Sequence, residues 1–469
     1  MKVSVIGELG FEDMFEKRFD EFCTESEFIR VFNSRLRGKN GGGRDCLTPE
    51  QYRDKHPDDF ARLANECLLG MHKFAHYNER LIIKGRNKYP RVISIPTVRD
   101  RLVLSVLNEY LQQEFGNLVN RKPANQYISD IQAYLAKHKN QRVSFFKTDF
   151  SGFYDTVNRD RLIEMLNKKN LHPHAAKLII DSINTPTSNN SSKRTELTEY
   201  GIPQGLAISN ILSALYLEEF DEFFRQKADL YLRYVDDILM LNPDEDDMTY
   251  AIESYILEHN LNLYLNKEKT NIGVIGETDL NFVGYNFTKG KISLRKDNVT
   301  SFFNRLVKEC ISFRNQFNDK YLRPTFLQKD DDEFQEVMIE RINLSITGIK
   351  CDNSFFGWIH HYKQLTDLSL LYSLDKALRN RFLSFVSESH LKNLKTFRRC
   401  YYDIMDGRAS EVAFDFDIDG DLPKMKAFML KKGWLDSDID YTEEEITKKY
   451  QKIKRSIKKK MERHIGRIS

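Results

Sequence analysis

The four residues 234–237, which read Tyr-Val-Asp-Asp, restrict the local fold more than any other segment of this chain. They separate two apolar runs, 230–232 and 238–241, whose composition is typical of β-strands. Adjacent carboxylates in such a setting are costly unless an ion pair or a metal compensates their charge. The segment therefore predicts a β-hairpin that presents Asp236 and Asp237 to a divalent cation. Taken alone, the same four residues are equally compatible with a plain acidic turn.

Composition indicates a folded protein without an obvious export signal. The 469 residues suffice for about two to four domains, and 41% of them are hydrophobic. The net charge of +3 does not exclude a nucleic-acid partner, because phosphates respond to local basic surface. Six scattered cysteines without a Cys-x-x-Cys pair favour reduced thiols. With no leader or membrane-length apolar run, we expect a cytoplasmic protein that does not contact membranes.

The chain mixes helices and strands up to about residue 295 and is mainly helical beyond residue 298, which predicts an α+β fold. The expected elements are helices over 1–75, a basic β-hairpin over 81–96, a helix from 102 to 110, a strand over 143–148, helices over 159–184 and 211–224, the hairpin around 234–237, and strands around 282–285 and 291–294. The expected strand over 143–148 ends directly before another carboxylate, Asp149.

Two further segments carry candidate chemistry. Asp149 terminates an apolar strand, so it either stops the strand or joins Asp236 and Asp237 as a metal ligand if the strands are neighbours. Residues 201–205 read Gly-Ile-Pro-Gln-Gly, which imposes a defined turn and leaves Gln204 able to hydrogen-bond a base or sugar edge. As a lone pattern, the second segment would usually be an ordinary turn.

The order of these motifs resembles reverse transcriptases. The motifs are, in chain order, Asp149 with an aromatic residue five positions on, Pro-Gln-Gly at 203–205, Tyr-Val-Asp-Asp at 234–237, Glu-Lys-Thr at 268–270 and Phe-Val-Gly-Tyr at 282–285. Residues 91–103 resemble the fingers of bacterial reverse transcriptases related to group II introns, and 346–348 with 356–362 resemble their thumb. Within that lineage the chain looks most like the abortive-infection and defence-associated enzymes.

The resemblance implies an α+β right-hand polymerase, with fingers, an antiparallel-sheet palm, a helical thumb and a helical C-terminal extension. The expected domains are 1–140 for the N-terminal extension and fingers, 141–295 for the palm with part of the fingers, 296–400 for the thumb and 401–469 for the C-terminal extension. Ile208-Ser209-Asn210 departs from the Ser-Pro that the family often carries after Pro-Gln-Gly. No nuclease-like appendage follows the expected thumb, so a free-standing enzyme is expected.

The resemblance also implies catalytic and metal-binding roles. Asp149 and Asp236 would bind two Mg²⁺ ions, or Mn²⁺ in their place, with Asp237 a less direct ligand and the backbone of Phe150 an additional one. Lys269 would donate a proton to the departing pyrophosphate.

Nucleotide and primer contacts follow from the same resemblance. Tyr154 would stack beneath the sugar and exclude a 2′ hydroxyl, which selects dNTPs. Arg91, assisted by Lys84, would hold the triphosphate, and Gln204 with Gly205 would border the nucleotide and template. The residues expected near the primer end are Tyr234, Val235, Phe282, Val283, Gly284 and Tyr285.

The implied function is RNA-directed DNA synthesis on a structured non-coding RNA, with cDNA as the product, in antiphage defence. A second copy of the chain or another defence protein is a further expected partner. Three alternatives remain open: a maturase-like RNA-binding scaffold, a retron-type reverse transcriptase, and RNA-directed RNA synthesis.

The C-terminal region contains a basic helix and an imitation of a calcium loop. Residues 415–420 resemble the start of an EF-hand, but its twelfth position is Lys426 instead of Glu, so an amphipathic strand or acidic interaction segment is expected. The helix pattern over 446–461 places Ile446, Tyr450, Ile453, Ile457 and Met461 on one face and eight cations elsewhere. These cations could bind an RNA backbone, face solvent or contact the acidic segment 415–445. Binding to a membrane surface is a less favoured alternative.

Overall fold

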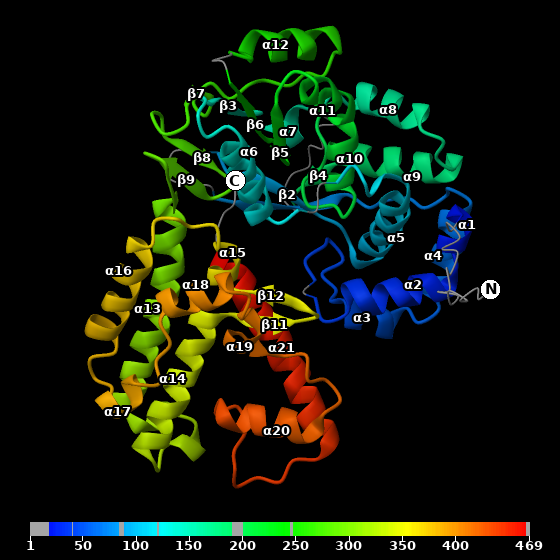
Figure 1. The fold of residues 1–469 in the computed structure, drawn as a ribbon. Helices are drawn as coiled ribbons and strands as arrows, with labels where there is room; N and C mark the ends of the chain where they lie inside the picture. The colour runs from blue at the N-terminus through cyan, green and yellow to red at the C-terminus, as the bar shows by residue number, and fades with distance from the viewer. Residues whose placement is uncertain are drawn as a thin grey trace, which may run out of the picture. The chain divides into compact units, whose positions relative to one another are not determined.

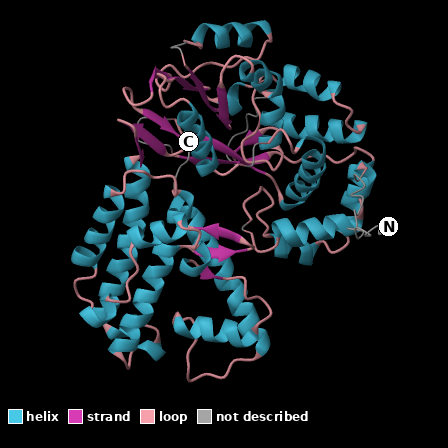
Figure 2. Cartoon of the chain, viewed as in Figure 1, coloured by secondary structure: helices cyan, strands magenta, loops and turns pink. Residues whose placement is uncertain are grey.

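The computed structural model describes residues 18–39, 41–83, 89–119, 122–189, 200–243 and 247–465 (Figure 1). The chain forms two compact units whose segments alternate along the sequence. The first unit comprises Met1–Arg121, Thr148–Ile238 and Asp247–Thr270; the second comprises Lys122–Lys147, Leu239–Asp246 and Asn271–Ser469. Helices and strands are mixed in the chain, as Figure 2 shows, which confirms the expected α+β class. The domain boundaries expected from the sequence stay a prediction.

The helices of the first unit begin with a short N-terminal series. They are α1 (Phe19–Phe22), α2 (Glu25–Val31), the π-helix η1 (Phe32–Leu36), α3 (Pro49–Lys55), α4 (Asp59–Leu68), α5 (Val98–Phe115), α7 (Phe153–Thr156), α8 (Arg159–Lys168), α9 (Pro173–Asn184), α10 (Ser209–Tyr216), α11 (Glu218–Arg225) and α12 (Thr249–Glu258). The apolar residues expected on one face of α5 are all buried: Leu102, Val103, Val106, Leu107 and Tyr110. This helix packs against α2 and α10.

Two helices expected to be continuous are each divided in two. The predicted helix 159–184 stops after Lys168 and restarts at Pro173, because proline can begin a helix but cannot continue one. The predicted helix 211–224 breaks at Leu217, whose φ of −99° and ψ of 7° leave the helical range. The break separates α10, in which every residue except Asn210 is buried, from the amphipathic α11, which buries Phe220 and Phe224.

The expected basic hairpin is present as β1 (Tyr77–Ile82) and β2 (Arg91–Ile95). The strands pair antiparallel, with Ile82 opposite Arg91, and β4 (Thr187–Ser188) adds to β1 in parallel. Lys84 lies outside the described residues.

A four-stranded sheet carries the candidate carboxylates. Its order is β5-β6-β3-β7, formed by β5 (Leu230–Tyr234), β6 (Asp237–Asn242), β3 (Ser144–Asp149) and β7 (Asn271–Val274). Strands β3 and β7 are antiparallel, with Phe146 opposite Ile272. Because β6 lies beside β3, the sheet brings the hairpin that starts β6 next to the strand that ends at Asp149.

The second unit has two further small sheets and a long helical region. Its elements are α6 (Ala124–Lys137), β8 (Leu280–Phe282), β9 (Tyr285–Thr288), β10 (Lys291–Leu294), α13 (Lys296–Asn318), η2 (Lys320–Leu322), η3 (Thr325–Leu327), α14 (Asp331–Thr347), β11 (Ile349–Cys351), β12 (Ser354–Phe356), α15 (Trp358–His361), α16 (Ser369–Ala377), η4 (Leu378–Phe382), α17 (Glu388–Leu391), α18 (Phe397–Met405), α19 (Ala409–Val412), β13 (Phe414–Asp415), α20 (Leu422–Lys431) and α21 (Glu443–Ile465). Helices α13 and α14 lie side by side (Figure 1).

The C-terminal part of the second unit has its own apolar cluster. Residues of β11, α20 and α21 meet there, with Phe416, Met429 and Tyr450 fully buried. The amphipathic strand expected near 415 is present as β13, which pairs in parallel with β11. No described helix combines the length and the apolar composition that crossing a membrane requires.

Candidate functional site

Asp149 is the last residue of β3, and only one of its two buried carboxylate oxygens accepts a hydrogen bond. Its side chain is 4% exposed, and its Oδ2 accepts a hydrogen bond from the ammonium of Lys269. Its Oδ1 is buried and has no hydrogen-bond partner among the described residues. A buried carboxylate oxygen without a donor is costly, so this atom suits a bound cation. The donor chemistry therefore fits the divalent metal expected from the sequence.

The expected hairpin at 234–237 is present, with β5 ending at Tyr234 and β6 beginning at Asp237. Val235 and Asp236 form the two-residue turn. Val235 has φ +60°, a left-handed conformation that β-branched residues rarely adopt. A positive φ at this turn position matches the twist of a two-residue hairpin. The left-handed conformation of Val235 thus forms the turn that places Asp236 at the end of the sheet.

An ion pair supports this turn from behind. Arg233 binds Asp221 of α11 through two nitrogens, with Nε donating to Oδ1 at 2.6 Å. Its third nitrogen, Nη1, donates to the carbonyl of Val235 at 2.8 Å. Both side chains are nearly buried, at 11% and 13% exposure. Tyr231 also donates to Asp221, at 2.7 Å. The sequence motifs did not predict a role for Arg233 or Asp221, although the arginine stands directly before Tyr-Val-Asp-Asp.

The three carboxylates lie close enough to influence one another electrostatically. Burial raises the pKa of Asp236 to about 6, the charge of Asp237 adds to this rise, and Asp149 contributes further. Lys269 opposes the rise. Such mutual repulsion is relieved by bound cations, so the structure brings together Asp149, Asp236, Asp237 and Lys269 in an arrangement that suits metal binding.

Backbone contacts place Lys269 beside Asp149. The amide of Asn266 donates to the carbonyl of Asp149 at 2.9 Å, and the amide of Lys269 donates to the carbonyl of Asn266 at 2.9 Å. The hydroxyls of Thr148 and Thr270 are 2.8 Å apart. Burial alone would lower the pKa of Lys269, but the hydrogen bond and charge of Asp149 raise it. Lys269 is therefore a charged ammonium at neutral pH, with a proton to donate.

Tyr154 of α7 belongs to the same site. Its hydroxyl lies 3.4 Å from the hydroxyl of Ser213 in α10. Burial is the main cause that raises the pKa of Tyr154; the charge of Asp236 acts in the same direction, and Arg233 and Arg91 act against it. These mutual effects place Tyr154 within electrostatic reach of both the carboxylates and the predicted triphosphate ligand Arg91.

The loop 201–205 fits tightly between Tyr154 and strand β2. The amide of Ile202 donates to the carbonyl of Tyr154, and the amide of Ser94 donates to that of Gln204, both at 2.7 Å. Gly205 has φ +106°, and a Cβ on it would lie 2.9 Å from Ile93 Cγ2 and 3.0 Å from the carbonyl oxygen of Ser94. Glycine is therefore required there. Since β2 begins at Arg91, this contact ties the loop to the strand that carries Arg91.

The remaining predicted residues are placed differently. Phe150 is buried and stacks on Phe153 with ring centroids 5.9 Å apart, so only its backbone is available as a ligand. The side chains of Phe282, Val283 and Tyr285 are buried in the second unit. A primer could therefore contact only the backbone of this segment. The role of the segment stays a prediction.

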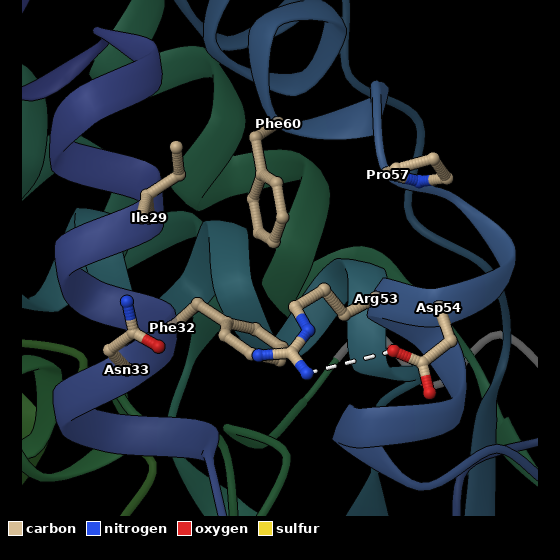
Figure 3. A pocket seen from close by; sticks show the side chains of 7 residues that line it. All are labelled: Ile29, Phe32, Asn33, Arg53, Asp54, Pro57 and Phe60. Carbon is tan, nitrogen blue, oxygen red and sulfur yellow. Dashed lines mark ion pairs between the residues drawn. The ribbon is translucent and has the colours of Figure 1, made fainter.

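Two other features do not contribute to this site. The ligand atoms of Cys351, Asp352 and Asp417 lie within 4.8 Å of one another, but Lys454 lies near both carboxylates and burial raises the pKa of Cys351 to about 11. A cavity of about 440 Å³ lies among the N-terminal helices (Figure 3). Its lining, which contains none of the predicted site residues, consists of Ile29, Phe32, Asn33, Arg53, Asp54, Pro57 and Phe60.

Comparison with known proteins gives relatives in sequence and in structure. The chain is 25% identical over 149 residues to an uncharacterized 91 kDa protein in a cob intron of Schizosaccharomyces pombe. The match covers 31% of this chain and only 18% of that protein. The telomerase of Candida albicans, solved with a TWJ fragment of telomeric RNA, aligns over 86% of this chain and 69% of its own, with 16% identity and a TM-score of 0.43. Telomerase from Candida tropicalis aligns over 81% and 69%, with 14% identity and a TM-score of 0.41.

The family comparison is the most informative. Residues 82–287 match the family described as reverse transcriptase (RNA-dependent DNA polymerase). This range contains β3, the Tyr-Val-Asp-Asp hairpin, the loop 201–205 and Lys269, which are the elements that form the site described above. Residues 82–287 are therefore similar to the reverse transcriptase domain, and the motifs of that family lie at the site described above.

Proposed function

We propose that this chain is a reverse transcriptase that copies RNA into cDNA by metal-dependent nucleotidyl transfer. The observation that carries the proposal is the convergence of Asp149, Asp236 and Asp237 around one site within the matched domain, with Asp149 Oδ1 buried and unpaired. Three clustered carboxylates need cations, and oxygen ligands of this kind suit Mg²⁺ or Mn²⁺.

Asp149 and Asp236 would hold two Mg²⁺ ions, with Asp237 and the backbone of Phe150 as supporting ligands. The bound ions would lower the pKa of the primer 3′ hydroxyl and stabilise the charge on the leaving pyrophosphate. Lys269, held as an ammonium beside Asp149, would donate the proton that pyrophosphate needs.

Tyr154, Arg91, Gln204 and Gly205 would select and orient the nucleotide. The backbone of Tyr154 is held by the loop 201–205 and its hydroxyl lies beside that of Ser213, so the ring can act as a barrier to a ribose 2′ hydroxyl. Arg91 would bind the triphosphate through its guanidinium. Tyr234 and Val235, which flank Asp236 in the hairpin, would contact the primer end.

Single-nucleotide incorporation tests the proposal. Purified protein is given a primer annealed to an RNA template, with Mg²⁺ and either dNTPs or rNTPs. We expect incorporation of dNTPs, its loss in Asp236→Asn, and a gain of rNTP use in Tyr154→Ala. Equal incorporation by wild type and Asp236→Asn would contradict the proposal, and a preference of wild type for rNTPs would support RNA-directed RNA synthesis instead.

We further propose that the template is a structured non-coding RNA and that the cDNA serves antiphage defence. The support is the resemblance of the fingers and palm motifs to those of defence-associated reverse transcriptases. Phage plating on cells that carry the wild-type gene or the Asp236→Asn variant tests the role. Protection that depends on Asp236 supports defence, and equal plating contradicts it.

A maturase-like RNA scaffold is the second candidate, favoured by the similarity to a protein in a cob intron. In that case an RNA-folding activity would survive the loss of the carboxylates. Splicing of a cognate intron by Asp236→Asn at the wild-type rate, without any dNTP incorporation by the wild type, would select this candidate.

A further inference from the structure

Eight of the nine lysines and arginines of helix α21 fall into two separate groups, and the ninth, Lys449, lies over the ring of Tyr441. Three lysines on its flanks are held by acidic residues of the same unit: Lys454 by Asp417 and Asp419, Lys458 by Asp352, and Lys460 by Glu309. The contact to the acidic segment expected from the sequence therefore accounts for Lys454 alone. The flanking lysines fix the helix to its surroundings.

Five other cations of α21 are exposed: Lys448, Lys452, Arg455, Lys459 and Arg463. They recur every three or four residues, which places them within an arc of roughly 80° and along about 22 Å of helix. In the described part of the chain none of them takes part in an ion pair, and Glu462 at the edge of the arc is the nearest acid along the helix. We name these five residues the basic stripe.

The opposite face of α21 is fully used for packing. Ile446, Tyr450 and Met461 are buried in the C-terminal apolar cluster, and Ile453 and Ile457 pack against it. The hydroxyl of Tyr450 also donates to the carbonyl of Phe416 at 2.9 Å. An interfacial membrane helix needs a free apolar face to insert among lipids, and α21 has none to offer.

A sixth cation reinforces one end of the stripe. Arg305 of α13 donates to the carbonyl of Arg463 at 2.5 Å, which fixes a guanidinium near the last turn of α21. Cations are favoured at that position because carbonyl groups there carry partial negative charge. Packing on one side and ion pairs on both flanks hold the helix in place. The cations of the basic stripe are therefore spaced regularly, as binding to a row of anions requires.

We propose that the basic stripe binds the phosphate backbone of the RNA–DNA duplex that the polymerase makes; this assignment rests on the proposed function. The stripe offers five cations at regular spacing along one helix face, and contacts of such cations to phosphates are independent of sequence. Its length corresponds to about six base steps of one strand.

Salt-dependent binding tests the stripe. The full chain binds a labelled RNA–DNA duplex of about 20 base pairs at increasing NaCl, followed by fluorescence anisotropy. The stripe variant carries Lys448→Gln, Lys452→Gln, Arg455→Gln, Lys459→Gln and Arg463→Gln. Its logarithmic salt slope should be shallower than that of wild type by about 3.5 to 4.5, since each of the five lost phosphate contacts contributes about 0.7 to 0.9. An unchanged slope overturns the proposal.

A matched control separates this surface from general charge. It carries glutamine at five other exposed cations of the second unit, again three lysines and two arginines: Lys376, Lys392, Lys395, Arg381 and Arg398. A slope change equal to that of the stripe variant overturns the proposal, and a smaller change supports it. Circular dichroism and the melting temperature confirm that both variants are folded.

Two further arms identify the partner and separate the proposals. Stripe-dependent binding to vesicles of anionic phospholipid, without a change in the duplex slope, assigns the stripe to membranes and overturns the proposal. The Asp236→Asn protein should keep the wild-type slope while losing dNTP incorporation. If wild type incorporates no dNTP, the proposed function fails, and the slope difference still reports on the stripe.

Discussion

The guanidinium of Arg233 donates a hydrogen bond to the carbonyl of Val235, and this contact fixes the turn on which Asp236 stands. Arg233 is itself held by a bidentate bond to Asp221, so α11 supports the hairpin through a single side chain. A geometric error of about 1 Å at a reacting centre costs about 100-fold in rate, which makes such support important for catalysis.

Replacing this arginine with lysine should slow the reaction more than it weakens substrate binding. We expect Arg233→Lys to lower kcat by about 10- to 100-fold with little change in KM for dNTPs. The lysine keeps the positive charge but cannot form the bidentate hydrogen bond that the guanidinium makes with Asp221. The Mg²⁺ concentration for half-maximal rate should rise. Steady-state primer extension across a Mg²⁺ titration measures both. Arg225→Lys, on the exposed face of α11, is the control, and equal kinetics for the two variants would contradict the assignment.

Lys269 offers a test of proton donation. Lys269→Ala should reduce the single-turnover rate of incorporation by about 100-fold or more, as expected when a general acid is removed. The exposed neighbour Lys267 makes no such contact with Asp149, so Lys267→Ala should remain near the wild-type rate. Rapid-quench measurement at saturating dNTP distinguishes the two. A Lys269→Ala rate within a factor of two of wild type would exclude the role.

Loss of one carboxylate should stabilise the metal-free protein. Asp236 is partly buried and lies within electrostatic reach of Asp237 and Asp149, so its charge is repelled in the folded state and solvated in the unfolded one. We expect Asp236→Asn to raise the metal-free melting temperature by a few degrees, for a gain of about 1 kcal/mol. Added Mg²⁺ should raise the melting temperature of wild type and leave the variant largely unchanged. A variant that melts below wild type without metal would show that repulsion is not the dominant effect.

Gly205 should tolerate no side chain. Gly205→Ala places a methyl group 2.9 Å from Ile93 Cγ2 at a φ of +106°, so both contact and backbone strain oppose it. We expect a loss of about 1–3 kcal/mol in the free energy of unfolding. Gly290 also has a positive φ but has open space around it, so Gly290→Ala isolates the strain alone. Urea denaturation should show the larger loss at Gly205, and a similar loss at both positions would show that the close contact costs little.

Acid should weaken the second unit through its buried histidines. Burial lowers the pKa of His360 and His361 to about 4 and that of His464 to about 3. A histidine whose pKa is depressed in the folded state binds protons in the unfolded state first, so stability is retained above pH 6.5 and lost as the pH falls towards these values. Each should cost about 2 kcal/mol between pH 7 and pH 5. Urea denaturation at both pH values measures the loss, and His360→Gln should reduce it. A pH-independent free energy of unfolding would contradict the buried, neutral state.

Local patterns were sufficient to predict the elements that present the chemistry. The apolar runs on either side of Asp236 predicted the hairpin, because alternation and turn position depend only on neighbouring residues. The proximity of Asp149 to this hairpin depends on β3 lying beside β6, which the motif order implied only through the family resemblance. The break at Pro173 was readable from the sequence, whereas the periodicity of the apolar residues continued through it.

Longer-range pairings escaped the sequence reading for a common reason. Asp221 and Arg233 lie on different elements, and no periodicity connects them. The division of the lysines of α21 likewise depends on where Asp352, Asp417 and Glu309 lie in the fold. The eight cations look alike in sequence, and only their neighbours separate those that stabilise the fold from those that face solvent.

The pairing of Asp149 with Lys269 has a consequence for charge balance in the proposed reaction. Three carboxylates and one ammonium leave two negative charges, which one divalent cation neutralises. A second divalent ion would give the site a net positive charge as long as no nucleotide is bound. The phosphates of an incoming nucleotide would supply the negative charge that balances it. Under the proposed function, the resting site would hold one divalent ion, and a second would be held only together with the phosphates of the nucleotide.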